Sequence, residues 1–509
     1  MSSLSGQKND LADEQFSFGG SPVPTGGRPD AVGTIEVHGI DVIPLDERHG
    51  RPSEMFGLWF GSNLIFTYLL SGAILIQLGI SLITSFVIVL VCDLAWVLVG
   101  VMSIPGPKTG TSTLVISRAQ YGIQGNKLSC ALSWLLNVAY EGVDFAIAAF
   151  AAYSLAAYFG WHPGTAGKTV LLLAIIAGSF ALGLFGHATI MYFQKVFAWV
   201  LGGASLLFLI FVVPHVHWSY VPAKPSHGSA LTAAVLIGIT VILSGPLSYT
   251  VGSDYSRYLP PDSSSRKIVA FTALGGYIPS VALTLIGVLA ATVVDATDLT
   301  TSIRPVVPNW FYPIFLLVVI FGLMANSVLS VYSSGFSLQS MGVRIRRSRT
   351  IWIDVVLGTA IAVYGVLIAT NFLTQLENFL VWSVYWYAPF FGIFMVEMWL
   401  SRGRYDGEEL FRIGGRYWFR NGFRWGGVVA LLGGMVVSIL ASQTPYLKGA
   451  ISTHLLSSGD LSAVGGFMVG AALYWVLCAA PDRRRFARSR SRSDSTLGAD
   501  ATPQSGNPV

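Results

Sequence analysis

The sequence predicts an all-α membrane protein with twelve transmembrane helices, arranged as a five-plus-five inverted repeat followed by two accessory helices. Three observations support this fold class. Only 11% of the 509 residues are charged and 53% are hydrophobic, whereas about a quarter of a soluble globular chain is charged. Apolar segments long enough to cross a bilayer follow one another along most of the chain. Polar interruptions of these segments recur five segments apart.

Twelve segments contain the roughly 20 apolar residues that a membrane helix needs to cross the hydrocarbon core. They are expected near residues 54–80, 82–104, 130–158, 169–186, 188–213, 231–253, 268–294, 311–341, 351–371, 376–400, 426–443 and 462–480.

The distribution of Lys and Arg indicates the orientation of these spans. With twelve spans, 27 of the 31 cationic residues fall in the two tails and the loops on their side of the membrane. The other four are Lys168, Lys224, Arg304 and Lys448. Because Lys and Arg near span ends favour the cytoplasm, we expect a multi-pass protein of the cell membrane with both termini cytoplasmic.

The chain is expected to divide into five parts. Residues 1–52 and 481–509 are polar tails, rich in Ser, Gly and Pro or in Arg, and are expected to be disordered and cytoplasmic. Residues 53–253 hold spans one to six, residues 254–400 hold spans seven to ten, and residues 401–480 hold a cytoplasmic loop and the accessory spans. The basic C-terminal tail is expected to contact anionic lipid headgroups.

Several classes of protein are disfavoured by the same sequence. Positive charge lies in short clusters beside apolar spans, so a nucleic-acid partner is not expected. Cys92, Cys130 and Cys478 lie in apolar segments without paired or metal-type spacing, which indicates neither a disulfide framework nor a metal site. The first 30 residues contain no apolar run of the signal-peptide type. No pattern indicates a cofactor or an oligomeric state.

Polar residues within the spans are candidates for function, because lipid offers them no partners. In the third span Asn137, Tyr140, Glu141 and Asp144 fall on one helical face. This face offers an amide, an aromatic ring and carboxylates, which suit a small planar polar ligand and a proton. Pairing of either carboxylate with Lys195 is an alternative explanation.

The eighth span carries a second polar face, formed by Asn326, Ser327, Ser330, Ser333, Ser334 and Ser337. Small hydroxyl residues also permit close helix packing in membranes, so packing explains the serines equally well. Asn326 is the stronger candidate for a binding residue.

Two spans are interrupted. Gly61-Ser62-Asn63 divides the first, and Ser244-Gly245-Pro246 falls within the sixth, where Pro246 removes a backbone donor. Broken helices in corresponding positions of two halves are typical of a transporter's binding site. The broken spans and the polar spans are each five apart, which predicts the inverted repeat. Asp93 in the second span has no evident partner, and both interhelical hydrogen bonding and ion coupling remain open for it.

In these features the chain resembles the nucleobase-cation symporter family, which includes purine-cytosine permeases and allantoin and hydantoin transporters. The resemblance covers residues 54–481. The motifs that carry it are Trp59-Phe-Gly-Ser-Asn63, Gly106-Pro-Lys-Thr-Gly110, Ser117-Arg-Ala-Gln-Tyr-Gly122, Ser253-Asp-Tyr-Ser-Arg-Tyr-Leu-Pro260, Val331-Tyr-Ser-Ser-Gly-Phe-Ser-Leu-Gln339, Glu377-Asn-Phe, Tyr385-Trp-Tyr-Ala-Pro389 and Arg402-Gly-Arg-Tyr-Asp406.

The resemblance implies a transporter that works by alternating access and binds a base between spans one, three, six and eight. By position, Tyr140 would stack on the base, where a Trp is common in the family, and Asn137 would hydrogen-bond it. The expected substrate-binding residues are Asn137, Tyr140, Glu141, Gly245, Ser248 and Asn326. The expected cation-coupling residues are Ser62, Ile65, Asp144, Ala325 and Asn326.

The chain departs from the family at Ala325-Asn326, where a Ser or Thr would be expected. This departure favours a proton over sodium as the coupling ion, carried by Glu141 or Asp144. The resulting expectation is a secondary active transporter, not an enzyme, that imports a nucleobase or related heterocycle with a proton or sodium. A cationic amine, vitamin or amino-acid-like solute held by Glu141 and Asp144 is the alternative. A membrane-embedded enzyme is disfavoured because the spans contain no His/Asp catalytic pair.

Overall fold

The computed structural model describes residues 39–183, 187–222, 226–295, 299–343, 347–369 and 371–479. These ranges form helices and connecting loops, without a strand of any length. Most of the two predicted tails, the cations Lys224 and Arg344, and the side chains of residues 345–349 lie outside the described part.

The predicted all-helical architecture is confirmed. Within the described ranges, eight helical stretches are long and apolar enough to cross a membrane, and a ninth is formed if one bent pair counts as a single span. The eight lie in the region of α4 to α6 (Leu82–Cys92 to Gly106–Thr109), α9 (Asn126–Tyr158), α11 (His187–Val212), α12 with α13 (Gly228–Ser248 and Gly252–Ser256), α14 (Ser265–Ala290), α16 (Phe311–Met341), α17 (Arg347–Val363) and α18 (Phe372–Ser401).

Three further predicted spans contain shorter apolar helices, so the number twelve stays a prediction. These are α10 (Thr165–Gly183), α19 (Trp425–Leu440) and α21 (Ser462–Tyr474). The remaining short helices, α7 (Thr113–Ile116), α8 (Arg118–Tyr121), α15 (Leu299–Ser302) and α20 (Ala450–Leu455), lie in connections between the long ones.

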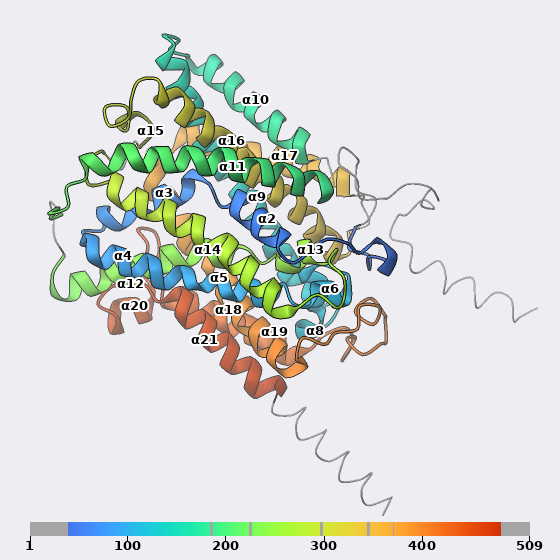
Figure 1. The fold of residues 1–509 in the computed structure, drawn as a ribbon. Helices are drawn as coiled ribbons and strands as arrows, with labels where there is room; N and C mark the ends of the chain where they lie inside the picture. The colour runs from blue at the N-terminus through green and yellow to red at the C-terminus, as the bar shows by residue number, and fades with distance from the viewer. Residues whose placement is uncertain are drawn as a thin grey trace, which may run out of the picture.

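The helices form one bundle in which α9 and α16 pack together, while α18, α19 and α21 form a group along one edge (Figure 1). The α10 helix lies at the opposite edge of the same view. Close approach of α3 to α14 depends on glycine: a Cβ added to Gly72 would lie 2.0 Å from the Thr284 carbonyl oxygen, and one added to Gly287 would lie 2.1 Å from that of Leu69. Small residues allow such backbone contact between membrane helices.

The predicted interruption of the first span is confirmed. The α2 helix (Glu54–Ser62) and α3 (Phe66–Gln77) meet at an angle of 58°. Asn63 stabilises the break, because its Nδ2 donates to the Trp59 carbonyl at 2.7 Å and its Oδ1 accepts from the Tyr68 hydroxyl at 2.8 Å. Side chains of this kind satisfy groups that a broken membrane helix would otherwise leave without partners.

The sixth span is broken later than the sequence indicates. The α12 helix continues through Ser244-Gly245-Pro246 to Ser248, and helical structure resumes with α13 at Gly252. Pro246 costs the helix one backbone hydrogen bond, but the chain leaves helical geometry only at Tyr249, whose φ is −85° and ψ 67°.

The described part of the chain includes residues on the N-terminal side of position 53. Residues 39–49, here called the N-terminal strap, bury Ile40 and Ile43. Arg257 Nη1 donates to the Gly39 carbonyl at 2.7 Å, and Thr111 Oγ1 donates to the Ile40 carbonyl at 2.6 Å. The strap thereby joins the connection after the second predicted span to the one after the sixth.

Candidate functional site

A pocket lies where the two broken spans face α9 and α16. Pockets between helices of a bundle are common small-molecule sites. Seven of the residues expected from the sequence line it, namely Ile65, Asn137, Tyr140, Asp144, Gly245, Ser248 and Asn326. The structure therefore brings the third-span and eighth-span faces together with both breaks.

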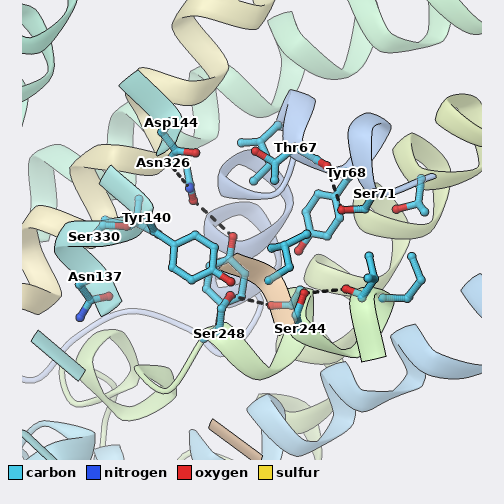
Figure 2. A pocket seen from close by; sticks show the side chains of 18 of the residues that line it. Thr67, Tyr68, Ser71, Asn137, Tyr140, Asp144, Ser244, Ser248, Asn326 and Ser330 are labelled. Atoms are coloured by element: carbon cyan, nitrogen blue, oxygen red, sulfur yellow. Dashed lines mark hydrogen bonds between the residues drawn. The ribbon is translucent and has the colours of Figure 1, made fainter. Parts of the chain in front are cut away.

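Two aromatic rings face this space. In Figure 2 the rings of Tyr140 and Tyr68 lie on opposite sides of the pocket. The Tyr140 ring is held edge-on against Phe379, with ring centroids 4.7 Å apart, and its hydroxyl lies 3.4 Å from Ser383 Oγ. A planar ligand could contact either ring face, since aromatic pairs favour such stacked or edge-on arrangements.

Asp144 and Asn326 form a polar pair along one wall (Figure 2). Asn326 Nδ2 donates to Asp144 Oδ2 at 2.7 Å, and the Tyr249 hydroxyl donates to Asn326 Oδ1 at 3.3 Å. Ser327 Oγ lies 3.5 Å from the same carboxylate oxygen. Asp144 is thus bound to α16 through Asn326, whereas Lys195, its alternative partner in the sequence analysis, is exposed on α11.

The pocket wall also has polar atoms without a protein partner. The Asn137 Nδ2, the Ser333 hydroxyl and both carboxylate oxygens of Asp93 are buried without a hydrogen bond among the described residues. Buried polar atoms of this kind are normally paired. Such atoms in a pocket can therefore bind a ligand or an ion.

Three predicted site residues do not line the pocket. The carboxylate of Glu141 is directed toward α17, where its Oε2 would lie 3.8 Å from a Cβ added to Gly358. Ser62 Oγ donates to the Trp59 carbonyl at 3.3 Å. The Ala325 carbonyl accepts a hydrogen bond from Gln194 Nε2 of α11 at 3.0 Å.

Other pocket residues were not among those expected from the sequence. Tyr68 and Tyr249 follow the two helix breaks, and Thr284 comes from α14. Asp93, noted in the sequence without a partner, also lines the pocket. Among the described residues that line it, none is Lys, Arg or His, so the side-chain charges at the wall are carboxylates alone.

Residues 42–470 match the protein family described as permeases for cytosine/purines, uracil, thiamine and allantoin. The chain belongs to this permease family. It is 27% identical over 459 residues to a putative purine-cytosine permease of Bacillus subtilis, covering 87% of this chain and 96% of that one. It is 24% identical over 506 residues to a purine-cytosine permease of Emericella nidulans, covering 93% and 94% of the two chains.

The permease also shares its fold with a solved structure. It superposes on Mhp1, a nucleobase-cation-symport-1 family transporter in a closed conformation with bromovinylhydantoin bound, with a TM-score of 0.69. The match covers 86% of this chain and 94% of Mhp1 at 16% identity. The resemblance to nucleobase-cation symporters is thereby confirmed, and the permease is a multi-pass membrane transporter by family and by its apolar helices.

Proposed function

We propose that the permease imports a nucleobase such as cytosine or a purine, or a related heterocycle, across the cell membrane by symport with a proton or sodium. The observation that carries this proposal is the pocket at the two helix breaks, which combines two aromatic rings with the Asp144–Asn326 pair. Rings bind the flat faces of a heterocycle, and the amide and carboxylate bind its polar edge. The family is described as permeases for cytosine, purines, uracil, thiamine and allantoin, all of which are heterocycles.

The proposed mechanism is alternating access by a five-plus-five inverted repeat within twelve spans. The two helix breaks and the two polar helices stand five predicted spans apart, as two repeats of opposite orientation require. Cation binding is proposed to close the broken helices around the base before the bundle opens to the cytoplasm. In this orientation both termini are cytoplasmic and the helices are surrounded by lipid.

A proton is favoured over sodium by the residues at the eighth span. Ala325 and Asn326 stand where a Ser or Thr hydroxyl would be expected at a sodium site, and the Ala325 side chain has no oxygen. The Asn326 amide is engaged as well, because its Nδ2 donates to Asp144 and its Oδ1 accepts from Tyr249. Hard cations need several oxygen ligands, and the eighth span offers one fewer here.

A thermal-shift screen of the purified permease tests the function. A bound ligand at 100 times its Kd stabilises the folded state by about 2.7 kcal/mol, so a substrate is expected to raise the melting temperature by several degrees. Nucleobases, allantoin and hydantoins are compared with and without sodium, at matched ionic strength. Stabilisation by none of them, with folded protein shown by a cooperative melting transition, contradicts the proposal.

A second candidate is a cationic amine or amine-bearing vitamin. The carboxylates of Asp93 and Asp144 at the pocket wall, with no cationic side chain among the described lining residues, favour it. Competition separates the two functions: neutral bases displace the bound ligand in the first case, and cationic amines of similar size displace it in the second.

A further inference from the structure

Asp93 lies in the second predicted span, at a point where the helix changes its geometry. The α4 helix ends at Cys92, a 3₁₀ turn covers Asp93–Ala95, and α5 (Trp96–Met102) continues the span. A 3₁₀ stretch within a longer helix often marks a functional hinge. The residue is 1% exposed and lines the pocket, yet neither of its carboxylate oxygens has a hydrogen-bond partner among the described residues.

No cation is placed to neutralise this carboxylate from the helices packed against it. Those helices are α4, α5, α12 and α14. The α5 and α12 sequences contain no titratable residue, and α4 contributes the buried Cys92. In α14, Arg266 and Lys267 are exposed near the start of the helix, whereas the Tyr277 hydroxyl donates to the Leu90 carbonyl at 3.1 Å.

The side chain that approaches from α3 is also neutral. Tyr68 shares the pocket with Asp93, but its hydroxyl donates to Asn63. The Ser280 hydroxyl of α14 lies near Asp93 but donates to the Tyr277 carbonyl at 3.2 Å. An ionised carboxylate without a neighbouring cation is disfavoured in a dry interior. The residues around Asp93 therefore favour its neutral carboxylic acid form.

We propose that Asp93 carries the coupling proton of the permease. The inference rests on the proposed symport function. It assigns to Asp93, for which the sequence left ion coupling open, the role expected of Glu141 or Asp144. The proton comes from the outer water and adds to the carboxylate to form a carboxylic acid, and it leaves to the cytoplasmic water when the pocket opens there. No other bond forms or breaks.

Neither of the two other carboxylates fits this role as well. Asp144 Oδ2 accepts from Asn326 at 2.7 Å, and a donor of this kind stabilises the ionised form. The two carboxylate oxygens of Glu141 also lack a hydrogen-bond partner among the described residues, but Glu141 does not line the pocket. A proton drives transport only if its affinity differs between the two conformations, and Asp93 lines the pocket that is proposed to open alternately to the two sides.

The test is Asp93→Asn, which keeps the shape of the side chain and removes the proton site. In proteoliposomes the measured quantity is accumulation of labelled substrate under an inward proton gradient divided by accumulation without one, at a concentration that saturates exchange in each variant. This ratio is expected to exceed one in the wild type and to fall to one in Asp93→Asn. Substrate affinity is expected to depend on pH in the wild type and to be independent of pH in the variant.

Asp354→Asn is the matched control. Asp354 is a buried carboxylate of α17 that accepts from Trp134 Nε1 at 2.9 Å and from Ser334, and it does not line the pocket. This variant is expected to retain gradient-driven accumulation. Both variants are compared with the wild type by size-exclusion profile and melting temperature, so that misfolding is recognised.

Three results would overturn the inference. Gradient-driven accumulation that survives in Asp93→Asn shows that the proton binds elsewhere. Loss of that accumulation in Glu141→Gln, with Asp93→Asn unaffected, assigns the proton to Glu141. Loss of exchange together with accumulation in a folded Asp93→Asn shows that Asp93 binds the substrate itself.

Failure of the proposed function has a different signature. A wild-type permease that neither binds nor exchanges any heterocycle disproves the function without bearing on Asp93. The protonation is then read directly from the infrared carbonyl band of a buried carboxylic acid. Because Glu141 can contribute to the same band, the variants are compared by difference spectra. Asp93→Asn is expected to lose one component of the band that Asp354→Asn retains, and a band that Asp93→Asn leaves unchanged overturns the assignment.

Discussion

Polar side chains within the permease differ in whether the protein already satisfies them. The Asp144 carboxylate and the Asn326 amide bind one another at 2.7 Å, and Tyr249 adds a donor to the amide oxygen. Such charge-assisted hydrogen bonds are stronger than neutral ones. The Asn137 nitrogen has no such partner. The Asp144–Asn326 pair is therefore suited to keep the pocket wall in place, and Asn137 is suited to bind the ligand.

Replacement of Asn137 by alanine tests this division. We expect Asn137→Ala to lower uptake of the transported heterocycle by about 5- to 150-fold, since an unpaired polar group in a dry site costs about 1–3 kcal/mol. The amount of protein in the membrane is expected to stay unchanged. Radiolabelled uptake of cytosine and purines, with immunodetection of the membrane fraction, measures both quantities.

Asn378→Ala is the control for this experiment. Asn378 of α18 is also buried with an unpaired side-chain amide among the described residues, but it does not line the pocket. Its removal is expected to leave uptake close to the wild-type rate. Normal uptake by Asn137→Ala would remove Asn137 from the site.

The residue pattern of one helix predicts a shared face but not what lies opposite. Spacing placed Asn137, Tyr140 and Asp144 together, and the structure puts all three at the pocket. Glu141 fits the same spacing, yet its side chain is directed toward α17. The polar face of α9 covers a wider arc of the helix than the part that lines the pocket. Tyr68 and Tyr249 could not be found by spacing, since their place depends on how the two broken helices cross.

At the scale of the helices, breaks were predicted where small polar residues, glycine or proline interrupt an apolar span. Asn63 falls at the predicted break of the first span and stabilises it with its amide. Pro246 indicates the right helix but not the right residue, because a proline weakens the turn before it and tertiary contacts decide where the chain unwinds. The contact Thr113 N to Asp254 Oδ1, at 2.8 Å, holds the helix after the break.

The crossing of α3 and α14 depends on backbone contact at Gly72. A methyl group there would meet the Thr284 carbonyl oxygen at 2.0 Å, so the helices must separate. We expect Gly72→Ala to lower the free energy of unfolding by about 1–3 kcal/mol, the usual cost of overpacking a core. Thermal unfolding in detergent, followed by tryptophan fluorescence, measures the change.

Gly203→Ala of α11 provides the comparison. A Cβ added at Gly203 meets nothing within 4 Å, and alanine has the higher helix propensity. Stability is expected to stay the same or to rise slightly. Equal destabilisation by both substitutions would show that loss of glycine flexibility, and not the crossing of α3 with α14, is responsible.

At the scale of the whole molecule, the lengths of the helices and the distribution of Lys and Arg give different numbers of membrane spans. Within the described residues, eight or nine helical stretches pass a test of length and composition. The alternation of cationic loops requires twelve, which counts α10, α19 and α21 as spans. The α19 helix has 16 residues and so extends about 24 Å, less than the roughly 30 Å of a typical hydrocarbon core. Whether α19 crosses decides between the counts for this region.

Two single-cysteine substitutions distinguish these topologies. The three native cysteines are buried, so a maleimide is expected to label the introduced cysteine instead. Ser264 and Ala450 are exposed and lie before α14 and after α19. If α14, α16, α17, α18 and α19 all cross, five spans separate the two positions, so they face opposite sides. A membrane-impermeant maleimide is then expected to label Ala450→Cys in intact cells and Ser264→Cys only after permeabilisation. Labelling of both on the same side would show that α19 does not cross, and the reverse pattern would invert the orientation inferred from Lys and Arg.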